Sequence, residues 1–167
     1  MESNLLMNFS VDKENKTVHI KREFDASLSL VWSAWTEAEI LDQWWAPAPF
    51  KSETKIMEFK EGGKRLYAMV GPDDQKRWSI FNYSSISPKT NFKYSATFSD
   101  ADGNPNSEFG SSYWDLHFSE QGDLTVVDIS IKRDSLEELE KIIEMGFKEG
   151  ITATMKSLDK IFEDQNK

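Results

Sequence analysis

Apolar and polar residues alternate over residues 17–25, the first segment of the chain with a regular pattern. Val18, Ile20 and Phe24 fall on one face, and most positions between them are polar. A period of two residues is typical of a β-strand with one buried face, so we predict a strand here. The preceding residues 1–16 are polar and aperiodic, and we expect them to form a flexible lead-in.

Two short helices are predicted directly after this strand. Ser27 precedes the mainly apolar run 28–35 and has the position of an N-cap. Residues 36–39 read Thr-Glu-Ala-Glu, the pattern of a capping box, which predicts a second helix that ends before Pro47.

The middle of the chain divides into segments of strand length, separated by clusters of Gly, Pro, Asp and Asn. These segments are rich in aromatic and β-branched residues and contain no proline, which favours strands. They span roughly 52–59, 64–70, 76–86, 89–98, 111–119 and 123–132. With the strand at 17–25 they predict a curved antiparallel sheet of about seven strands, whose apolar face needs a cover.

The cover is predicted at the end of the chain, where apolar residues recur at every third or fourth position. They are Leu136, Leu139, Ile143, Phe147, Ile151, Met155, Leu158 and Phe162. This spacing, after a capping box at 135–138, predicts one continuous amphipathic helix over 135–162. Gly146 and Gly150 each cost about 1 kcal/mol relative to alanine inside such a helix. We therefore expect a close backbone contact, a kink or the opening of a pocket at these glycines.

The amino-acid composition of the chain indicates which kinds of ligand and binding partner to expect. Six Trp and eleven Phe in 167 residues require either a large core or a pocket. A net charge of −9, with basic residues scattered singly, argues against nucleic acid. There is no cysteine, which excludes disulfides and thiolate metal sites. No apolar run reaches the roughly 20 residues of a membrane span, and the first residues lack a signal-peptide pattern, so we expect a cytoplasmic protein.

Several short sequence pieces carry a resemblance that covers residues 17–165. In chain order they are Arg22-Glu23-Phe24-Asp25-Ala26, Val31-Trp32-Ser33-Ala34-Trp35-Thr36, Leu41, Trp44-Trp45-Ala46-Pro47, Glu61-Gly62-Gly63, Met69-Val70-Gly71-Pro72-Asp73, Tyr83-Ser84-Ser85-Ile86-Ser87-Pro88, Phe98-Ser99-Asp100 with Gly103, and Met145-Gly146-Phe147 with Gly150. Together they resemble the helix-grip domains of the START-like (SRPBCC) superfamily. Within it they are most similar to bacterial proteins related to the C-terminal domain of the activator of the heat-shock protein 90 ATPase. These proteins usually carry Trp where this chain has Ile151.

The resemblance implies an α+β helix-grip fold, in which a curved antiparallel sheet with two short helices after its first strand wraps around a long C-terminal helix. A chain of this length fits one domain, which we expect at 17–167 after the lead-in 1–16. The resemblance also implies a cavity between the sheet and the long helix. It implies no reaction, because members include lipid binders, polyketide cyclases and co-chaperone domains.

The expected cavity has mainly aromatic and Met candidates for its wall, typical of sites that take hydrophobic ligands. They are Trp44, Trp45, Phe50, Met57, Met69, Phe81, Tyr83, Tyr94, Trp114, Phe147, Ile151 and Met155. The alternative is that these side chains pack against one another in a solid core. Two polar anchors are considered. Arg22, on the apolar side of its strand, would bind an anionic head group or pair with an acid such as Glu23 or Asp25, and Glu58 would act as a pocket carboxylate.

No catalytic or metal-binding motif is present in the sequence. His19 and His117 lack the spacing of metal ligands, and no Gly-x-Ser-x-Gly occurs. We therefore expect no metal, no cofactor and no recognisable catalytic set. The leading hypothesis is noncatalytic binding of a hydrophobic or amphipathic small molecule. The alternatives are a stress-related co-chaperone or adaptor that binds a chaperone, and an enzyme of the polyketide cyclase or aromatase type. Both a monomer and a homodimer fit the sequence.

Overall fold

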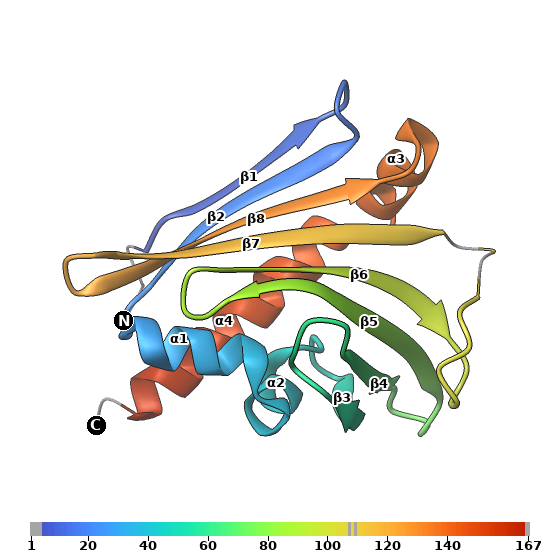
Figure 1. The fold of residues 1–167 in the computed structure, drawn as a ribbon, viewed down its shortest axis with the longest axis horizontal. Helices are drawn as coiled ribbons and strands as arrows, with labels where there is room; N and C mark the ends of the chain where they lie inside the picture. Colours follow the sequence, from blue (N-terminus) through green and yellow to red (C-terminus); the bar gives the residue numbers. More distant parts are fainter. Residues whose placement is uncertain (1–4, 107, 109, 166–167) are drawn as a thin grey trace.

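The computed structural model describes residues 5–106, 108 and 110–165. Its centre is an antiparallel sheet of eight strands in the order β1-β2-β8-β7-β6-β5-β4-β3 (Figure 1). The strands are β1 (Met7–Asp12), β2 (Thr17–Phe24), β3 (Lys51–Met57), β4 (Lys64–Val70), β5 (Lys76–Ser87), β6 (Asn91–Ser99), β7 (Ser111–Gln121) and β8 (Leu124–Arg133). The helices are α1 (Leu28–Thr36), α2 (Ala38–Trp44), α3 (Leu136–Glu144) and α4 (Phe147–Gln165). The α+β helix-grip fold is thus confirmed.

One strand was not predicted. Residues 7–12 were expected in a flexible lead-in, and this expectation is wrong, because they form β1 and pair with β2. As the edge strand, β1 has weak apolar alternation: Met7 and Phe9 are only partly buried, and Val11 is 37% exposed. The ring of Phe9 lies 6.2 Å from that of Phe147, so β1 also contacts the start of α4.

The two short helices differ in how their first turns are capped. The Ser27 hydroxyl accepts a hydrogen bond from the Leu30 amide at 3.3 Å, which confirms the predicted N-cap of α1. The predicted capping box at 36–39 is wrong. Thr36 is the last residue of α1 and donates its hydroxyl to the Trp32 carbonyl, and Glu37 is the N-cap of α2 without a side-chain bond.

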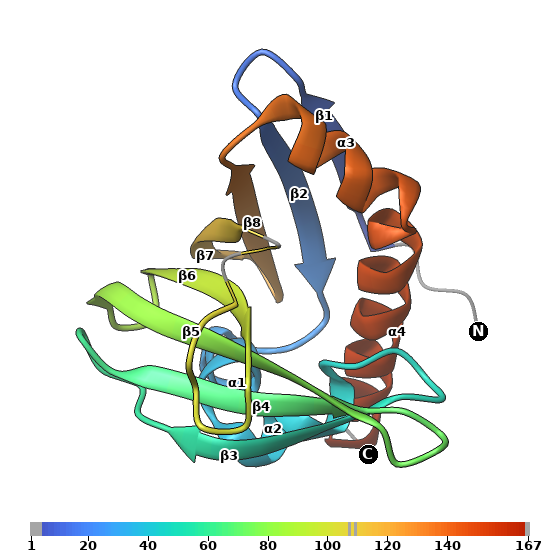
Figure 2. The ribbon, with the colours of Figure 1, turned by 90° about the vertical axis from the view of Figure 1, so that its right-hand side faces the viewer.

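The C-terminal segment is two helices, so the prediction of one continuous helix is wrong. Helix α3 ends at Glu144, its C-cap Met145 is 74% exposed, and Gly146 has a φ of 93°. This left-handed conformation is accessible to glycine and ends a helix. Figure 2 shows α4 running along one side of the bent sheet, with α3 meeting it at an angle at one end. The helix gripped by the sheet is therefore α4 alone.

The core fills the space between the sheet and the four helices. Phe24 of β2 packs edge to face against Trp35 of α1 and Phe162 of α4, at centroid distances of 5.4 and 5.8 Å. Further buried members are Val18, Ile20, Val31, Leu41, Trp44, Leu116, Val127, Ile129, Leu139 and Leu158. Among the described residues, no helix is long and apolar enough to cross a membrane.

Candidate functional site

A cavity of about 410 Å³ lies between the sheet and the two C-terminal helices. Ligand pockets in proteins typically measure about 300–1,000 Å³, so this space is sufficient for a small organic molecule. Strands β4 to β8 form one wall, α3 and α4 form the opposite wall, and the connection from α2 to β3 closes one side. The lining residues are Trp45, Pro47, Phe50, Tyr67, Met69, Arg77, Ser79, Phe81, Ala96, Thr97, Phe98, Gly110, Ser112, Trp114, Ile131, Arg133, Ile142, Phe147, Gly150, Ile151 and Thr154.

Many of the residues predicted for the pocket meet in this cavity. Those that line it are Trp45, Phe50, Met69, Phe81, Trp114, Phe147 and Ile151. Those that do not are Trp44, Met57, Tyr83, Tyr94 and Met155. Trp44 belongs to the core and donates its indole N–H to the Ala34 carbonyl at 2.9 Å. Tyr94 lies behind the wall, stacked on Phe81 at 4.2 Å between ring centroids and on Trp114 at 5.4 Å.

Sequence reasoning missed several residues of the wall. Tyr67 shares a strand face with Met69 two positions later, so the alternation within β4 was a usable signal. Ile131 lies on the apolar face of β8, where the alternation with Asp128 and Ser130 was likewise a usable signal. Ile142, in contrast, reaches the cavity from α3, whose separate direction the sequence did not reveal.

Neither predicted polar anchor lies in the cavity. Arg22 is 5% exposed and forms an ion pair with Asp159 of α4, and it also donates to the Glu23 carbonyl at 2.5 Å. Arg22 therefore joins the sheet to the gripped helix, which agrees with the alternative that it pairs with an acid. Glu58 is exposed, beyond the end of β3.

The polar groups that do line the cavity are mostly hydrogen-bonded within the protein. Tyr67 accepts from the Trp45 indole at 2.9 Å, and Ser112 accepts from the Trp114 indole at 3.0 Å. Thr154 donates to the Ile151 carbonyl at 2.8 Å. Among the described lining residues there is no carboxylate and no histidine. The cavity therefore has a mainly apolar wall with a few hydrogen-bonded polar side chains, and its described lining contains no side-chain acid–base pair.

A buried arginine lies directly behind this wall. Arg65 of β4 is 0% exposed, and its guanidinium carbon is 4.0, 5.2 and 5.6 Å from the ring centroids of Tyr67, Phe81 and Trp45. Burial lowers the pKa of Arg65, and burial likewise raises the pKa of Tyr83 and of Tyr94. Arg65 was not predicted as a site residue, although it lies on the same face of β4 as Tyr67.

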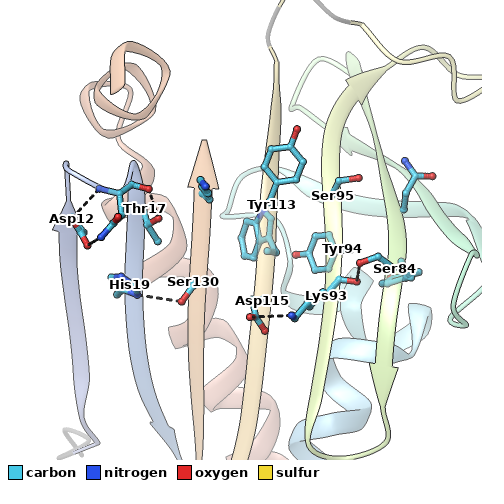
Figure 3. Close-up of a pocket in the computed structure, with 15 residues that line it drawn as sticks. Asp12, Thr17, His19, Ser84, Lys93, Tyr94, Ser95, Tyr113, Asp115 and Ser130 are labelled. Atoms are coloured by element: carbon cyan, nitrogen blue, oxygen red, sulfur yellow. Dashed lines mark hydrogen bonds and ion pairs between the residues drawn. The ribbon is translucent and has the colours of Figure 1, made fainter. Parts of the chain in front are cut away.

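A second hollow, of about 740 Å³, lies on the outer face of the sheet (Figure 3). Its polar side chains pair with one another: His19 with Ser130 at 3.2 Å, Lys93 with Asp115 at 3.9 Å. In Figure 3, Asp12, Thr17 and His19 border one side, and Ser84 and Lys93 border the other. Most residues that line this groove are polar or charged, unlike those of the cavity beside α4. The described residues contain no group of His, Asp and Glu suited to hold a metal ion.

Comparisons with known proteins agree with this architecture. A protein from Arthrobacter aurescens has a TM-score of 0.88 and 27% identity, with 94% of this chain and 91% of that chain covered. The protein Ms6760 from Mycobacterium smegmatis has a TM-score of 0.85 and 24% identity, with 94% and 96% covered. The AHSA1 protein from Silicibacter pomeroyi has a TM-score of 0.72 and 14% identity, with 89% and 99% covered. No curated protein matches the chain.

The family assignment rests on most of the chain. The model of the family described as "Activator of Hsp90 ATPase homolog 1-like protein" matches residues 25–163, from the end of β2 almost to the end of α4. The match includes every element that borders the cavity. The chain therefore belongs to the Activator of Hsp90 ATPase homolog 1-like protein family.

Proposed function

We propose that the protein binds a hydrophobic or amphipathic small molecule, without catalysis, in the cavity between the sheet and α4. The observation that carries this proposal is a space of about 410 Å³ with a mainly aromatic and aliphatic wall. Burial of apolar ligand surface there contributes roughly 25 cal/mol per Å². The lack of a carboxylate or histidine among the described lining residues favours binding over acid–base chemistry.

The position of Ile151 offers a direct test of the cavity. Ile151 is 8% exposed and lines the cavity from α4, so Ile151→Trp places a larger side chain inside it. The probe is N-phenyl-1-naphthylamine, an uncharged dye whose fluorescence rises in apolar sites. We expect Ile151→Trp to weaken dye binding at least tenfold, which corresponds to about 1.4 kcal/mol.

The control is Ala153→Trp, which adds the same side chain at an exposed position of the same helix. We expect this variant to bind the dye as the unmodified protein does. Unchanged binding by folded Ile151→Trp, or no dye binding by the unmodified protein, contradicts the proposal. Native mass spectrometry of protein purified from its own host then identifies a co-purified molecule.

The family description supports a second candidate, an adaptor that binds a chaperone. The two candidates are separable because the adaptor would use an outer surface. A chaperone captured equally by the unmodified protein and by Ile151→Trp supports the adaptor, and the absence of any chaperone in the pull-down counts against it.

A further inference from the structure

Arg65 is the most completely buried charged side chain that the structure describes. It projects from β4 on the same face as Tyr67 and Met69, with 0% of its surface exposed. A buried charge costs several kcal/mol of solvation unless good partners surround it. If the protein itself supplies partners for all N–H groups of Arg65, its role is structural, and any N–H group without a partner is available to a ligand.

The carboxylate nearest to Arg65 is engaged mainly elsewhere. Asp42 of α2 is 3.6 Å from Nη2 of Arg65, a long ion pair, and its side chain is 29% exposed. Its oxygens accept shorter hydrogen bonds, from the Ser52 hydroxyl at 2.8 Å and from the Thr54 hydroxyl and amide at 2.7 and 3.0 Å. Arg65 donates to the Ser52 hydroxyl at 3.0 Å.

Two buried donors in this region have no partner in the part of the chain that the structure describes. They are Nη1 of Arg65 and the hydroxyl of Tyr94. Buried polar atoms are nearly always hydrogen-bonded, so two such atoms in one region call for an explanation. The cation–π contacts to Tyr67, Phe81 and Trp45 offset part of the desolvation of the guanidinium but supply no acceptor for its N–H groups.

Both donors lie next to the cavity wall. The guanidinium lies over three rings that line the cavity, those of Tyr67, Phe81 and Trp45. Tyr94 is stacked on Phe81, the central ring of the same group. Burial raises the pKa of Tyr94, and the charge of Arg65 opposes part of this shift. Neither residue lines the cavity, so an acceptor group that reaches past these rings has a cation and a hydroxyl donor close by.

We propose that Arg65 and Tyr94 form a recognition site for a carboxylate, so that the ligand is an amphipathic carboxylic acid with its apolar body in the cavity. The inference rests on the proposed function and adds the chemical class of the ligand. A carboxylate suits this site because the planar guanidinium donates N–H groups to it, and charge-assisted bonds are roughly twice as strong as neutral ones. The alternative is a structural role, in which Arg65 joins α2, β3 and β4 through Asp42 and Ser52.

The test compares dodecanoic acid with 1-dodecanol, which has the same chain and an uncharged head group, by isothermal titration calorimetry at pH 7. We expect the acid to bind at least tenfold more tightly than the alcohol. Arg65→Met should remove this preference and leave the affinity for the alcohol unchanged. Tyr94→Phe, which keeps the stacked ring, should weaken the acid about threefold to tenfold.

Two controls separate this site from other charges and hydroxyls. Lys76→Met removes an exposed cation of the neighbouring strand β5 that does not line the cavity, and Tyr113→Phe removes an exposed hydroxyl on the outer face. Both should keep the preference for the acid. If Arg65→Met fails to fold, Tyr94→Phe still decides, because it deletes only an unpartnered atom.

Equal affinities for acid and alcohol, or a preference for the acid that Arg65→Met or Tyr94→Phe leaves intact, overturn the head-group site. If the naphthylamine dye still binds in that case, the apolar cavity stands and only the ligand class is wrong. If neither the dye nor either dodecyl compound binds, the proposed function itself fails.

Discussion

The two glycines of the C-terminal segment should respond in opposite directions to the same substitution. Gly146 separates α3 from α4 with a φ of 93°, whereas Gly150 lies inside α4 without a positive φ. A Cβ at Gly150 meets no atom within 4 Å, and a Cβ at Gly146 meets only Glu149 at 3.9 Å. Because neither Cβ clashes, the backbone conformation alone determines the outcome.

The magnitudes follow from that conformation. Alanine in the left-handed region costs about 1–2 kcal/mol, so Gly146→Ala should lower the free energy of unfolding by that amount. Alanine in a helix interior is favoured over glycine by about 0.5–1 kcal/mol, so Gly150→Ala should raise it. For a chain of this length, 1 kcal/mol shifts the Tm by about 2–4 °C. The variants should therefore melt below and above the unmodified protein.

Urea unfolding followed by tryptophan fluorescence measures both changes, with circular dichroism to confirm that the secondary structure is retained. In a continuous helix, both substitutions would stabilise the protein by similar amounts. A Gly146→Ala variant that is as stable as Gly150→Ala would therefore refute the break between α3 and α4. The same result would restore the single helix that the apolar pattern predicts.

Two further predictions concern buried polar groups. Asp159→Ala leaves Arg22 without its carboxylate and should lower the free energy of unfolding, measured by urea titration, by about 3 kcal/mol. The control Glu163→Ala, at an exposed site of α4, should change it by less than about 0.5 kcal/mol. Equal losses in the two variants would contradict a stabilising role of the Arg22–Asp159 pair. Burial raises the pKa of Tyr83 and Tyr94 above 10, so the folded state keeps these phenols protonated while the unfolded state ionises. Stability should be unaffected by these groups below pH 10 and should decline as the pH rises above it, as unfolding curves at increasing pH would show. Ionisation of all four tyrosines near pH 10 in the folded protein, seen by ultraviolet absorbance, would exclude this burial effect.

Local patterns were sufficient for most of the secondary structure. The alternation in 17–25 and in the aromatic segments that follow corresponds to β2 to β8, because a sheet with one apolar face imposes a period of two on its sequence. The serine before the apolar run gave the start of α1, because an N-cap depends on neighbouring atoms alone. The edge strand β1 was not predicted, because its positions are only partly buried and the alternation of apolar and polar residues is weak there.

Residues that approach from distant parts of the chain were decided by the tertiary structure. The apolar stripe continues past Gly146, so its period could not reveal that the backbone turns there. Trp44 and Trp45 are equally apolar and adjacent, yet one packs in the core and the other lines the cavity. Trp44 packs against Trp35 of α1, whereas Trp45 packs against Phe81 of β5 and Trp114 of β7, and no local pattern encodes this difference.

The two buried arginines show most clearly which properties follow from local sequence and which follow from tertiary packing. The sequence by itself determined that Arg22 is on an apolar strand face and therefore needs a partner. Only the fold brought Asp159, 137 positions away, to its guanidinium. For Arg65, the alternation with Tyr67 indicates the strand face on which the side chain lies. Its complete burial arises from α2 and from the aromatic rings that surround it. Periodicity fixes the direction of a side chain, and long-range packing determines what it meets.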